Sequence, residues 1–376
     1  KGHRVQDKLS FSLDELTLSK PALQINGALV VSSTSPAFSL DLQGADIDVD
    51  ATREAALAVA GETTPVKEIF AYLRGGKVPQ ISFHSQGESA SALGDLKNIV
   101  IKGQLQKGAV SIPEIKLDLT EVNGDVVISE GVLEGSKMST RLEGSSGHDG
   151  TLRVALGEDS DLFQLELMLS ADLPQAQHIL KRIVEKSEFA QLVDKVTNLK
   201  GSAIGKLILG DNLTDIKARV DMSDLNLTAD YQDLPFPVGV SSGQLSFAEK
   251  HIEFKDLSGT FGRSAFSDFA CNIDWTDALH IDLSSGKFAL VLDQLYPWLA
   301  SFDTTKEALK DVKQVTGRLD LTALTLKGAV DKTQNWQIAG AGAIHEIGIE
   351  TSRFPAKIEL PKGDFTLDAE KLTFQN

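Results

Sequence analysis

The stretch Gly243-Gln-Leu-Ser-Phe-Ala-Glu-Lys-His-Ile-Glu-Phe254 decides the fold class of this chain. Apolar and polar residues alternate on both sides of a short polar break. This pattern is typical of two antiparallel strands that are joined by a turn and bury one face. About 120 residues later the same order of features recurs, as Gly363-Asp-Phe-Thr-Leu367 followed by Leu372-Thr-Phe374. The sequence therefore predicts a β-repeat protein.

The segments around this stretch repeat as well. Leu234-Pro-Phe-Pro-Val238 precedes the first copy, and Phe354-Pro-Ala-Lys-Ile358 precedes the second. A weaker copy combines Ile112-Pro113 with Gly124-Asp-Val-Val-Ile128 and Leu133. A fragment near the N-terminus places Phe11-Ser-Leu13 and Leu16-Thr-Leu18 on two short strands. We expect a partial unit at 1–110, a middle unit at 111–232 and a C-terminal unit at 233–376, all in one array excised from a longer protein.

Two further segments recur between the middle and C-terminal units. Asn198-Leu-Lys-Gly201 resembles Gln314-Val-Thr-Gly317, and Asp224-Leu-Asn-Leu227 resembles Glu346-Ile-Gly-Ile349. Strand-like alternation also marks Phe38–Leu42, Ile115–Leu119 and Leu165–Leu169.

Each unit also contains one helical insert. Apolar residues spaced by three and four predict helices over Gln175–Leu199 and Leu295–Val315, with a shorter counterpart over Arg53–Ala60 and Val66–Leu73. Many strands with one helical pair per unit do not make a doubly wound sheet. The predicted fold is mostly β, an elongated and curved antiparallel array with short helical inserts and an apolar concave face.

Composition excludes several classes of protein. The 376 residues carry a net charge of −16 and no basic track, which argues against a nucleic-acid partner. The single cysteine, Cys271, allows no intrachain disulfide. No run reaches the roughly 18–20 apolar residues of a membrane span, and no signal peptide opens the chain.

No arrangement of residues predicts catalysis, a metal site or a cofactor. The histidines are scattered, without the spacing of a zinc site. Ser145-Ser-Gly-His-Asp-Gly150 contains serine, histidine and acid side by side, but six small polar residues in a row predict a surface loop. Asp46, Asp48 and Asp50 alternate with apolar residues, so we expect them on one solvated strand face.

The apolar face must be shielded from water, and the sequence leaves three ways of doing so. A second protein layer would make it the dry core of a structural or adhesive protein that binds protein partners. Closure into an outer-membrane barrel would call for aromatic girdles, which three Trp and three Tyr do not supply. A ligand would make the face a groove. Acyl chains suit such a groove, since each buried methylene contributes about 0.8 kcal/mol.

The pattern of Gly243–Phe254, followed by Leu257-Ser-Gly-Thr-Phe-Gly262-Arg-Ser, resembles the AsmA-like proteins of Gram-negative bacteria, in particular the large YhdP- and TamB-type members. The resemblance is strongest over 201–376. It implies a repeating β-groove that carries phospholipid between the inner and outer membranes, without catalytic residues. It also implies a periplasmic location, an inner-membrane anchor outside this chain, and membrane components as partners at both ends of the array.

The residues expected to line the groove follow from strand phase. They are Phe247, Phe254, Phe261, Phe266, Phe269, Ile281, Leu283, Phe288, Leu290, Phe365, Leu367 and Phe374.

Overall fold

The computed structural model describes residues 1–5, 8–19, 22–60, 69–112, 117–157, 160–184, 187–212, 214–332, 335–368 and 371–375. It is 70% strand and 15% helix, and its strands belong to one antiparallel sheet that does not close on itself. The predicted class, mostly β with short helical inserts, is confirmed. Pro113 of the weaker repeat copy, Ile115 and residues 66–68 of the first helical insert lie outside the described residues.

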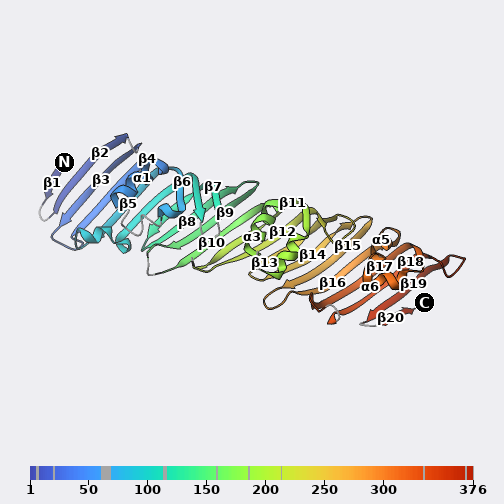
Figure 1. Ribbon diagram of the computed structural model, residues 1–376. Helices are drawn as coiled ribbons and strands as arrows, with labels where there is room; N and C mark the ends of the chain where they lie inside the picture. The colour runs from blue at the N-terminus through green and yellow to red at the C-terminus, as the bar shows by residue number, and fades with distance from the viewer. Residues whose placement is uncertain are drawn as a thin grey trace. The chain divides into compact units, whose positions relative to one another are not determined.

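The chain divides into two compact units, which Figure 1 shows in chain order. Unit 1 comprises residues 1–170 and 206–218. Its elements are β1 (Gly2–Val5), β2 (Lys8–Ser19), β3 (Ala22–Ser32), β4 (Phe38–Asp48), α1 (Val49–Ala60), β5 (Leu73–Gly87), η1 (Ser91–Gly94), η2 (Leu96–Asn98), β6 (Ile99–Ile112), β7 (Leu117–Ser129), β8 (Val132–Leu142), β9 (Ser145–Ala155) and most of β10 (Leu162–Asp172).

Unit 2 comprises residues 171–205 and 219–376. The strands β11 (Val196–Asn212) and β12 (Ile216–Tyr231) contribute residues to both units. The remaining elements of unit 2 are α3 (Leu173–Val184), α4 (Glu188–Asp194), β13 (Val238–Ala248), β14 (His251–Phe261), β15 (Ser264–Asp274), β16 (His280–Val291), α5 (Leu292–Leu299), α6 (Asp303–Leu309), β17 (Val312–Ala329), β18 (Gln337–Thr351), β19 (Ile358–Asp368) and β20 (Lys371–Gln375).

The strands form a meander in which each pairs with the next along the chain, from β2 to β10 in unit 1 and from β12 to β20 in unit 2. The helical insertions follow β4, β10 and β16, so they recur after every sixth strand. The predicted inserts are therefore present, but with other bounds. Residues 197–199 belong to β11, and Val315 belongs to β17.

The backbone repeats with the same six-strand interval. Gly76, Gly201 and Gly317, near the starts of β5, β11 and β17, all have positive φ, at 125°, 127° and 106°. In the strands that follow them, Lys107, Asp224 and Glu346 have φ of 50°, 51° and 50°. The backbone therefore matches at Gly201 and Gly317 and at Asp224 and Glu346, within the two segment pairs compared in the sequence. The proposed unit boundaries stay predictions.

The N-terminal repeat fragment is wrong as a pair of strands. Phe11, Leu13, Leu16 and Leu18 all lie in the single strand β2, which has a register shift between Leu13 and Leu16. The shift spaces Leu13 and Leu16 three positions apart instead of the two of regular alternation, and in the sequence this resembles a turn.

A left-handed residue in mid-strand recurs across the sheet and explains its departures from strict alternation. In β14, Asp256 has φ of 53°, and the pairing with β15 shifts register between Phe254 and Leu257. Such a bulge inserts one extra residue into the strand. Ile252 and Phe254 before the bulge and Leu257 after it therefore point to the same face, although strict alternation would put Leu257 on the other.

The same device overturns the expected loop at Ser145–Gly150. These residues begin β9, and Asp149 is its left-handed residue, with φ of 51°. His148 Nδ1 lies 2.8 Å from Asp149 Oδ2 on the surface. Ser145 is buried and, by strand alternation, faces the other side of the sheet. The polar run was mistaken for a loop because glycine and serine also suit a bulged strand.

The three aspartates near the end of β4 do not share a strand face. Asp46 has a left-handed backbone with φ of 55°, and Asp50 already belongs to α1. Asp48 Oδ1 accepts a hydrogen bond from Ala51 N at 3.1 Å, so its carboxylate satisfies a free N–H at the start of this helix.

We predict that the left-handed conformation at Asp256 limits which residues fit there. Asp256→Gly should leave stability within about 0.5 kcal/mol, because glycine adopts positive φ without strain. Asp256→Val should destabilise by about 1–2 kcal/mol, because a β-branched residue is strained in this conformation. Urea unfolding of both variants measures the difference. Thr260→Val, an exposed position on the same strand, is the control, and an equal loss in it would contradict the prediction.

Candidate functional site: an apolar trough face

The apolar residues of unit 2 lie in register across one face of its sheet, which we call the trough face. Directly paired residues of antiparallel strands point to the same side. The pairings connect one row from β12 to β20, which consists of Leu227, Val240, Gly259, Phe266, Phe288, Leu321, Gly342, Phe365 and Phe374. No polar side chain interrupts this row.

The twelve residues expected to line the groove fall on this face. Phe266, Phe288, Phe365 and Phe374 belong to the row itself. The other eight join it through their own pairings or strand positions; they are Phe247, Phe254, Phe261, Phe269, Ile281, Leu283, Leu290 and Leu367.

Burial differs along the face. Phe247, Leu283 and Phe365 are buried, while Phe374 is 59% exposed. Rings contact one another within and between strands, since the Phe269 centroid lies 6.0 Å from Phe266 of the same strand and 6.3 Å from Phe288 of the next. The face thus has aromatic clusters and open apolar surface.

Unit 1 has an equivalent face, but its row is aliphatic. It runs from β2 to β10 through Leu16, Ile25, Gly44, Ile81, Gly103, Val126, Gly135, Leu152 and Leu165. A second row beside it contains Leu42, Phe83, Ile101, Ile128, Leu133, Val154 and Phe163.

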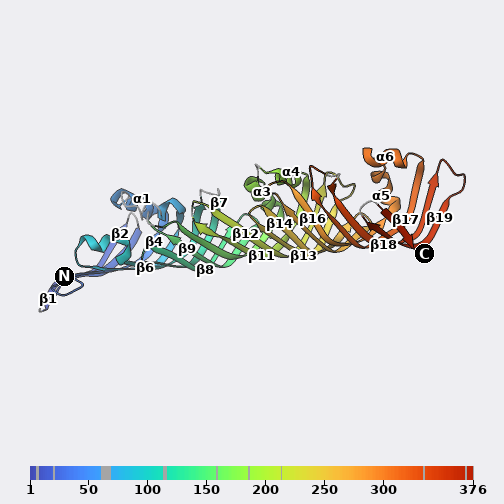
Figure 2. The same cartoon turned by 90° about the horizontal axis from the view of Figure 1, so that it is seen from below.

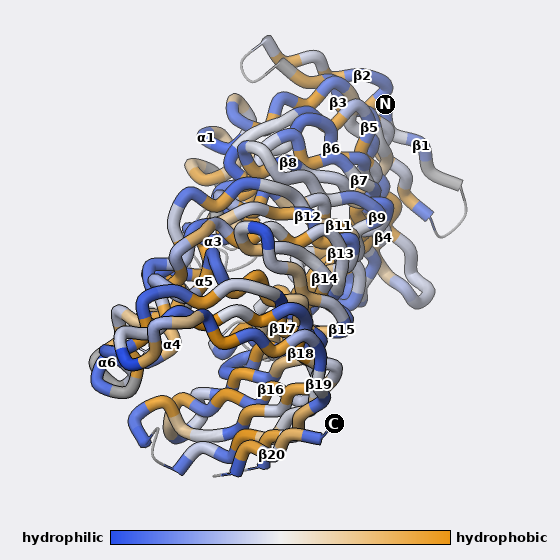
Figure 3. Tube along the Cα trace, turned by 90° about the vertical axis from the view of Figure 1, so that its right-hand side faces the viewer, coloured by the Kyte–Doolittle hydropathy of each residue, from blue (hydrophilic) through white to orange (hydrophobic). Residues whose placement is uncertain are grey.

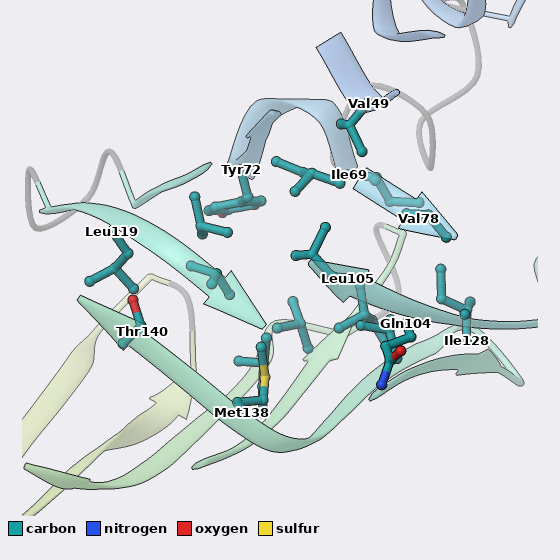
Figure 4. A pocket seen from close by; sticks show the side chains of 18 of the residues that line it. Val49, Ile69, Tyr72, Val78, Gln104, Leu105, Leu119, Ile128, Met138 and Thr140 are labelled. Atoms are coloured by element: carbon teal, nitrogen blue, oxygen red, sulfur yellow. The ribbon is translucent and has the colours of Figure 1, made fainter. Parts of the chain in front are cut away.

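A cavity of about 370 Å³ lies over the trough face of unit 1. Its floor comes from the sheet, and its roof comes from the first helical insertion, namely Val49 and Thr52 of α1 and the helical residues 69–72. Figure 4 shows Val49 and Ile69 on the roof, across from Leu105 and Met138 of the sheet. Its size falls in the range of small-molecule sites. Its lining is almost entirely hydrocarbon.

Two glycines, Gly103 and Gly147, are among the residues that line the cavity. Gly103 pairs with Ile81 and Val126 on the neighbouring strands. Met138 lies against Gly135, where an added Cβ would be 2.4 Å from its sulfur. At Gly103 an added Cβ would meet nothing closer than 3.4 Å, so this position can accept a methyl group at ordinary contact distances.

The cavity is the part of the site that the sequence did not predict. All twelve predicted residues lie in unit 2, whereas the cavity is in unit 1. The available signal was the run Ile101-Lys-Gly-Gln-Leu105, with glycine at an inward position of an alternating strand.

Charged residues occupy the other face of the sheet and its edges. Cross-strand ion pairs join Lys206 Nζ to Glu166 Oε2 at 2.6 Å and Lys287 Nζ to Asp268 Oδ2 at 2.5 Å. All four side chains are largely exposed, so such pairs contribute little stability. They keep the outer face hydrated while the trough face stays apolar, and Figure 3 shows both characters alternating along the strands.

Cys271 lies on the trough face, paired with Phe254 and Leu283. Burial, together with the negative charge of Asp282, raises the pKa of its thiol to about 11. The thiol is therefore protonated at neutral pH and behaves as a small apolar group.

Within the described ranges, no cluster of three or more His, Cys, Asp or Glu side chains is arranged to hold a metal ion. No described helix combines the length and apolarity that crossing a membrane requires. No family model, curated protein or solved structure matches this chain.

We predict that Cys271 is nearly inert in the folded protein. A pKa of about 11 instead of 9.0 reduces the thiolate fraction at pH 8 by about 100-fold, and only the thiolate is alkylated. Iodoacetamide labelling followed by mass spectrometry should be slow in buffer and fast in urea. Labelling at equal rates in both would contradict the burial of this face.

We predict that Gly103→Ala is tolerated and increases stability by about 0.4–1 kcal/mol, because the added methyl has space and restricts the unfolded chain. Gly76→Ala is the matched comparison in the same unit. There φ is 125° and the new Cβ would lie 2.7 Å from the Gly108 Cα, so we expect destabilisation. Thermal unfolding of the two variants should move in opposite directions, and a shared direction would argue against the cavity.

Proposed function

We propose that the trough face binds the acyl chains of phospholipids without covalent or catalytic chemistry, and that the chain is a segment of a lipid-carrying β-groove. The observation that carries this proposal is the cavity in unit 1, which has an almost entirely hydrocarbon lining and is not filled by protein side chains. In a dry core, large side chains fill such space to the density of an organic crystal.

The energetics favour a hydrocarbon ligand. Moving the acyl chains of a two-chain phospholipid, with roughly thirty methylenes, from an apolar environment into water costs on the order of 20–25 kcal/mol of transfer free energy, at about 0.8 kcal/mol per methylene. A face that is apolar from strand to strand offsets much of this cost wherever the chains lie. The cavity offers no charged group to a head group, so we expect the head group to stay in solvent.

The resemblance to AsmA-like proteins supplies the biological setting of the proposal. In that setting the protein works in the periplasm, and the array ends meet components of the inner and outer membranes. These partners and the location are part of the proposal and rest on the resemblance alone.

The alternative is a structural protein whose trough face is covered by protein. The observation that favours it is local: α4 packs against the trough face of unit 2 with buried aromatic side chains. Phospholipid that stays bound during purification would support the lipid-carrying function, and its absence would support the structural one.

We predict that a photoreactive benzoylphenylalanine at Ile101 or Phe288 becomes cross-linked to phospholipid in cells or in lipid vesicles. The same residue at Lys102 or Lys287 should not, because each lysine is exposed and neighbours its partner on the opposite face of the same strand. Mass spectrometry of the adducts identifies the lipid. Equal labelling at both members of a pair, or none at either, would overturn the proposal.

We further predict that Gly103→Leu lowers lipid retention by filling the cavity. Gly94→Leu is the control, since an added Cβ at Gly94 meets nothing within 4 Å and Gly94 does not line the cavity. Lipid extracted from equal amounts of purified protein is the measurement. Unchanged retention in the Gly103 variant, with adducts still formed at Phe288, would move the binding site out of unit 1.

A further inference from the structure

The first of the two helical insertions of unit 2, which contains α3 and α4, begins at one rim of its sheet. It leaves the strands after Asp172 and returns to them at Val196, the first residue of β11. Lys195 Nζ contacts Asp233 Oδ2 at 2.6 Å, in the turn that follows β12. Since antiparallel strands reverse direction at each step, this rim holds the starts of the odd-numbered strands and the ends of the even-numbered ones. We call it the insertion rim.

The far rim of unit 2 holds the turns between β13 and β14 and between β15 and β16. Trp275 and Leu279 belong to the second of these turns. Backbone hydrogen bonds join the far-rim segments, with Trp275 N donating to Lys250 O at 3.0 Å and Val330 N donating to Leu279 O at 2.9 Å. The far rim is thus a continuous, bonded border.

The first residues of α4 are attached to this far rim. Leu279 N donates a hydrogen bond to Glu188 Oε2 at 2.9 Å. The Phe189 ring stacks on Trp275, with centroids 4.1 Å apart and planes 7° from parallel. Trp275 in turn lies 6.4 Å from Phe247 of the trough face. An insertion that starts at one rim is therefore fastened at the other, so α4 crosses the trough.

The crossing fills this part of the trough with protein side chains. Phe189, Val193, Trp275 and Leu279 are each 7% exposed or less. Figure 2 shows α3 and α4 on one side of the unit 2 strands. The first insertion, by contrast, leaves a cavity between itself and the sheet of unit 1. Insertions at equivalent places in the strand order thus leave a cavity over the face of unit 1 but fill the space over the face of unit 2 beside Trp275.

Contacts at both ends hold α4 in this position, and an ion pair between Lys181 Nζ and Asp194 Oδ1 at 3.0 Å also joins it to α3. The helix has seven residues, which is too short to be stable by itself. At its end, Gln177 Nε2 on α3 donates to the carbonyls of Val193 and Val196, at 3.3 and 2.9 Å. These bonds tie α4 to the insertion rim. The attachment to the far rim depends on the Glu188 hydrogen bond and the Phe189 stack.

We propose that α4 is a gate across the trough of unit 2, with Glu188 and Phe189 as the latch that holds it shut against Leu279 and Trp275. This inference rests on the proposed function, since a gate regulates access of hydrocarbon to the same apolar face. Release of the latch frees the Trp275 ring and the surface beside Phe247 for an acyl chain. The Gln177 bonds act as the hinge.

The test uses Trp275 as its own reporter. Trp298→Phe and Trp336→Phe leave Trp275 as the only indole of the full chain. Phosphatidylcholine vesicles with dibrominated acyl chains quench an indole that hydrocarbon reaches. We expect weak quenching with the latch intact, and several-fold stronger quenching after Phe189→Leu or Glu188→Ala. Glu188→Gln keeps an acceptor oxygen and should stay close to the parent protein.

A chemical cross-link that holds α4 against the far rim completes the experiment. In a Cys271→Ala background, Glu188→Cys and Leu279→Cys are bridged by a short bismaleimide, and the bridge should abolish the quenching that the unbridged double variant shows. Circular dichroism confirms that each variant is folded, and if Phe189→Leu fails this check, Glu188→Ala carries the comparison. Equal quenching in parent, latch and locked proteins would overturn the gate.

The lipid adduct at Ile101 in unit 1 distinguishes failure of the gate proposal alone from failure of the lipid-binding proposal on which it rests. If Ile101 still forms the adduct while Trp275 never responds, α4 is a fixed brace and the lipid-binding proposal stands. If neither position responds, the lipid-binding proposal fails together with the gate.

Discussion

The structure depends on keeping apolar side chains on one face of strands that are not regular. A left-handed residue in mid-strand, such as Lys107, Asp149 or Asp256, adds one residue and restores the phase of the side chains beyond it. A bulge also increases local twist and bends the strand. Polar residues suit these positions, because Asn and Asp tolerate the left-handed conformation better than apolar residues do. The acidic surface and the unbroken apolar rows are therefore two results of the same backbone device.

The helical insertions build on this face and give its two units different properties. Their six-strand interval places one insertion after β4, β10 and β16. The first roofs a cavity lined mainly by aliphatic residues, whereas α4 packs Phe189 onto Trp275 and covers the sheet beside it.

The sequence was sufficient to predict the strands and the side chains on their apolar face, because alternation of apolar and polar residues indicates both directly. Phe247, Phe254 and Phe261 were assigned to one face even though two of them flank the bulge at Asp256. The loop expected at Ser145–Gly150 was wrong, since small polar residues serve turns and bulged strands alike. The cavity was not predictable, because it depends on how residues 69–72 approach Gly103 from a distant part of the chain. The latch was hidden for the same reason, as 91 positions separate Glu188 from Leu279.

The uninterrupted rows have one more consequence, which concerns motion. A hydrocarbon lying along Ile81, Gly103 and Val126 would be held by dispersion and by exclusion of water, neither of which has a direction. Shifting it by one strand, about 4.8 Å, breaks no hydrogen bond and exposes no additional area. For such a ligand the binding energy would change little among these three positions, so the activation barrier to sliding between them would be small.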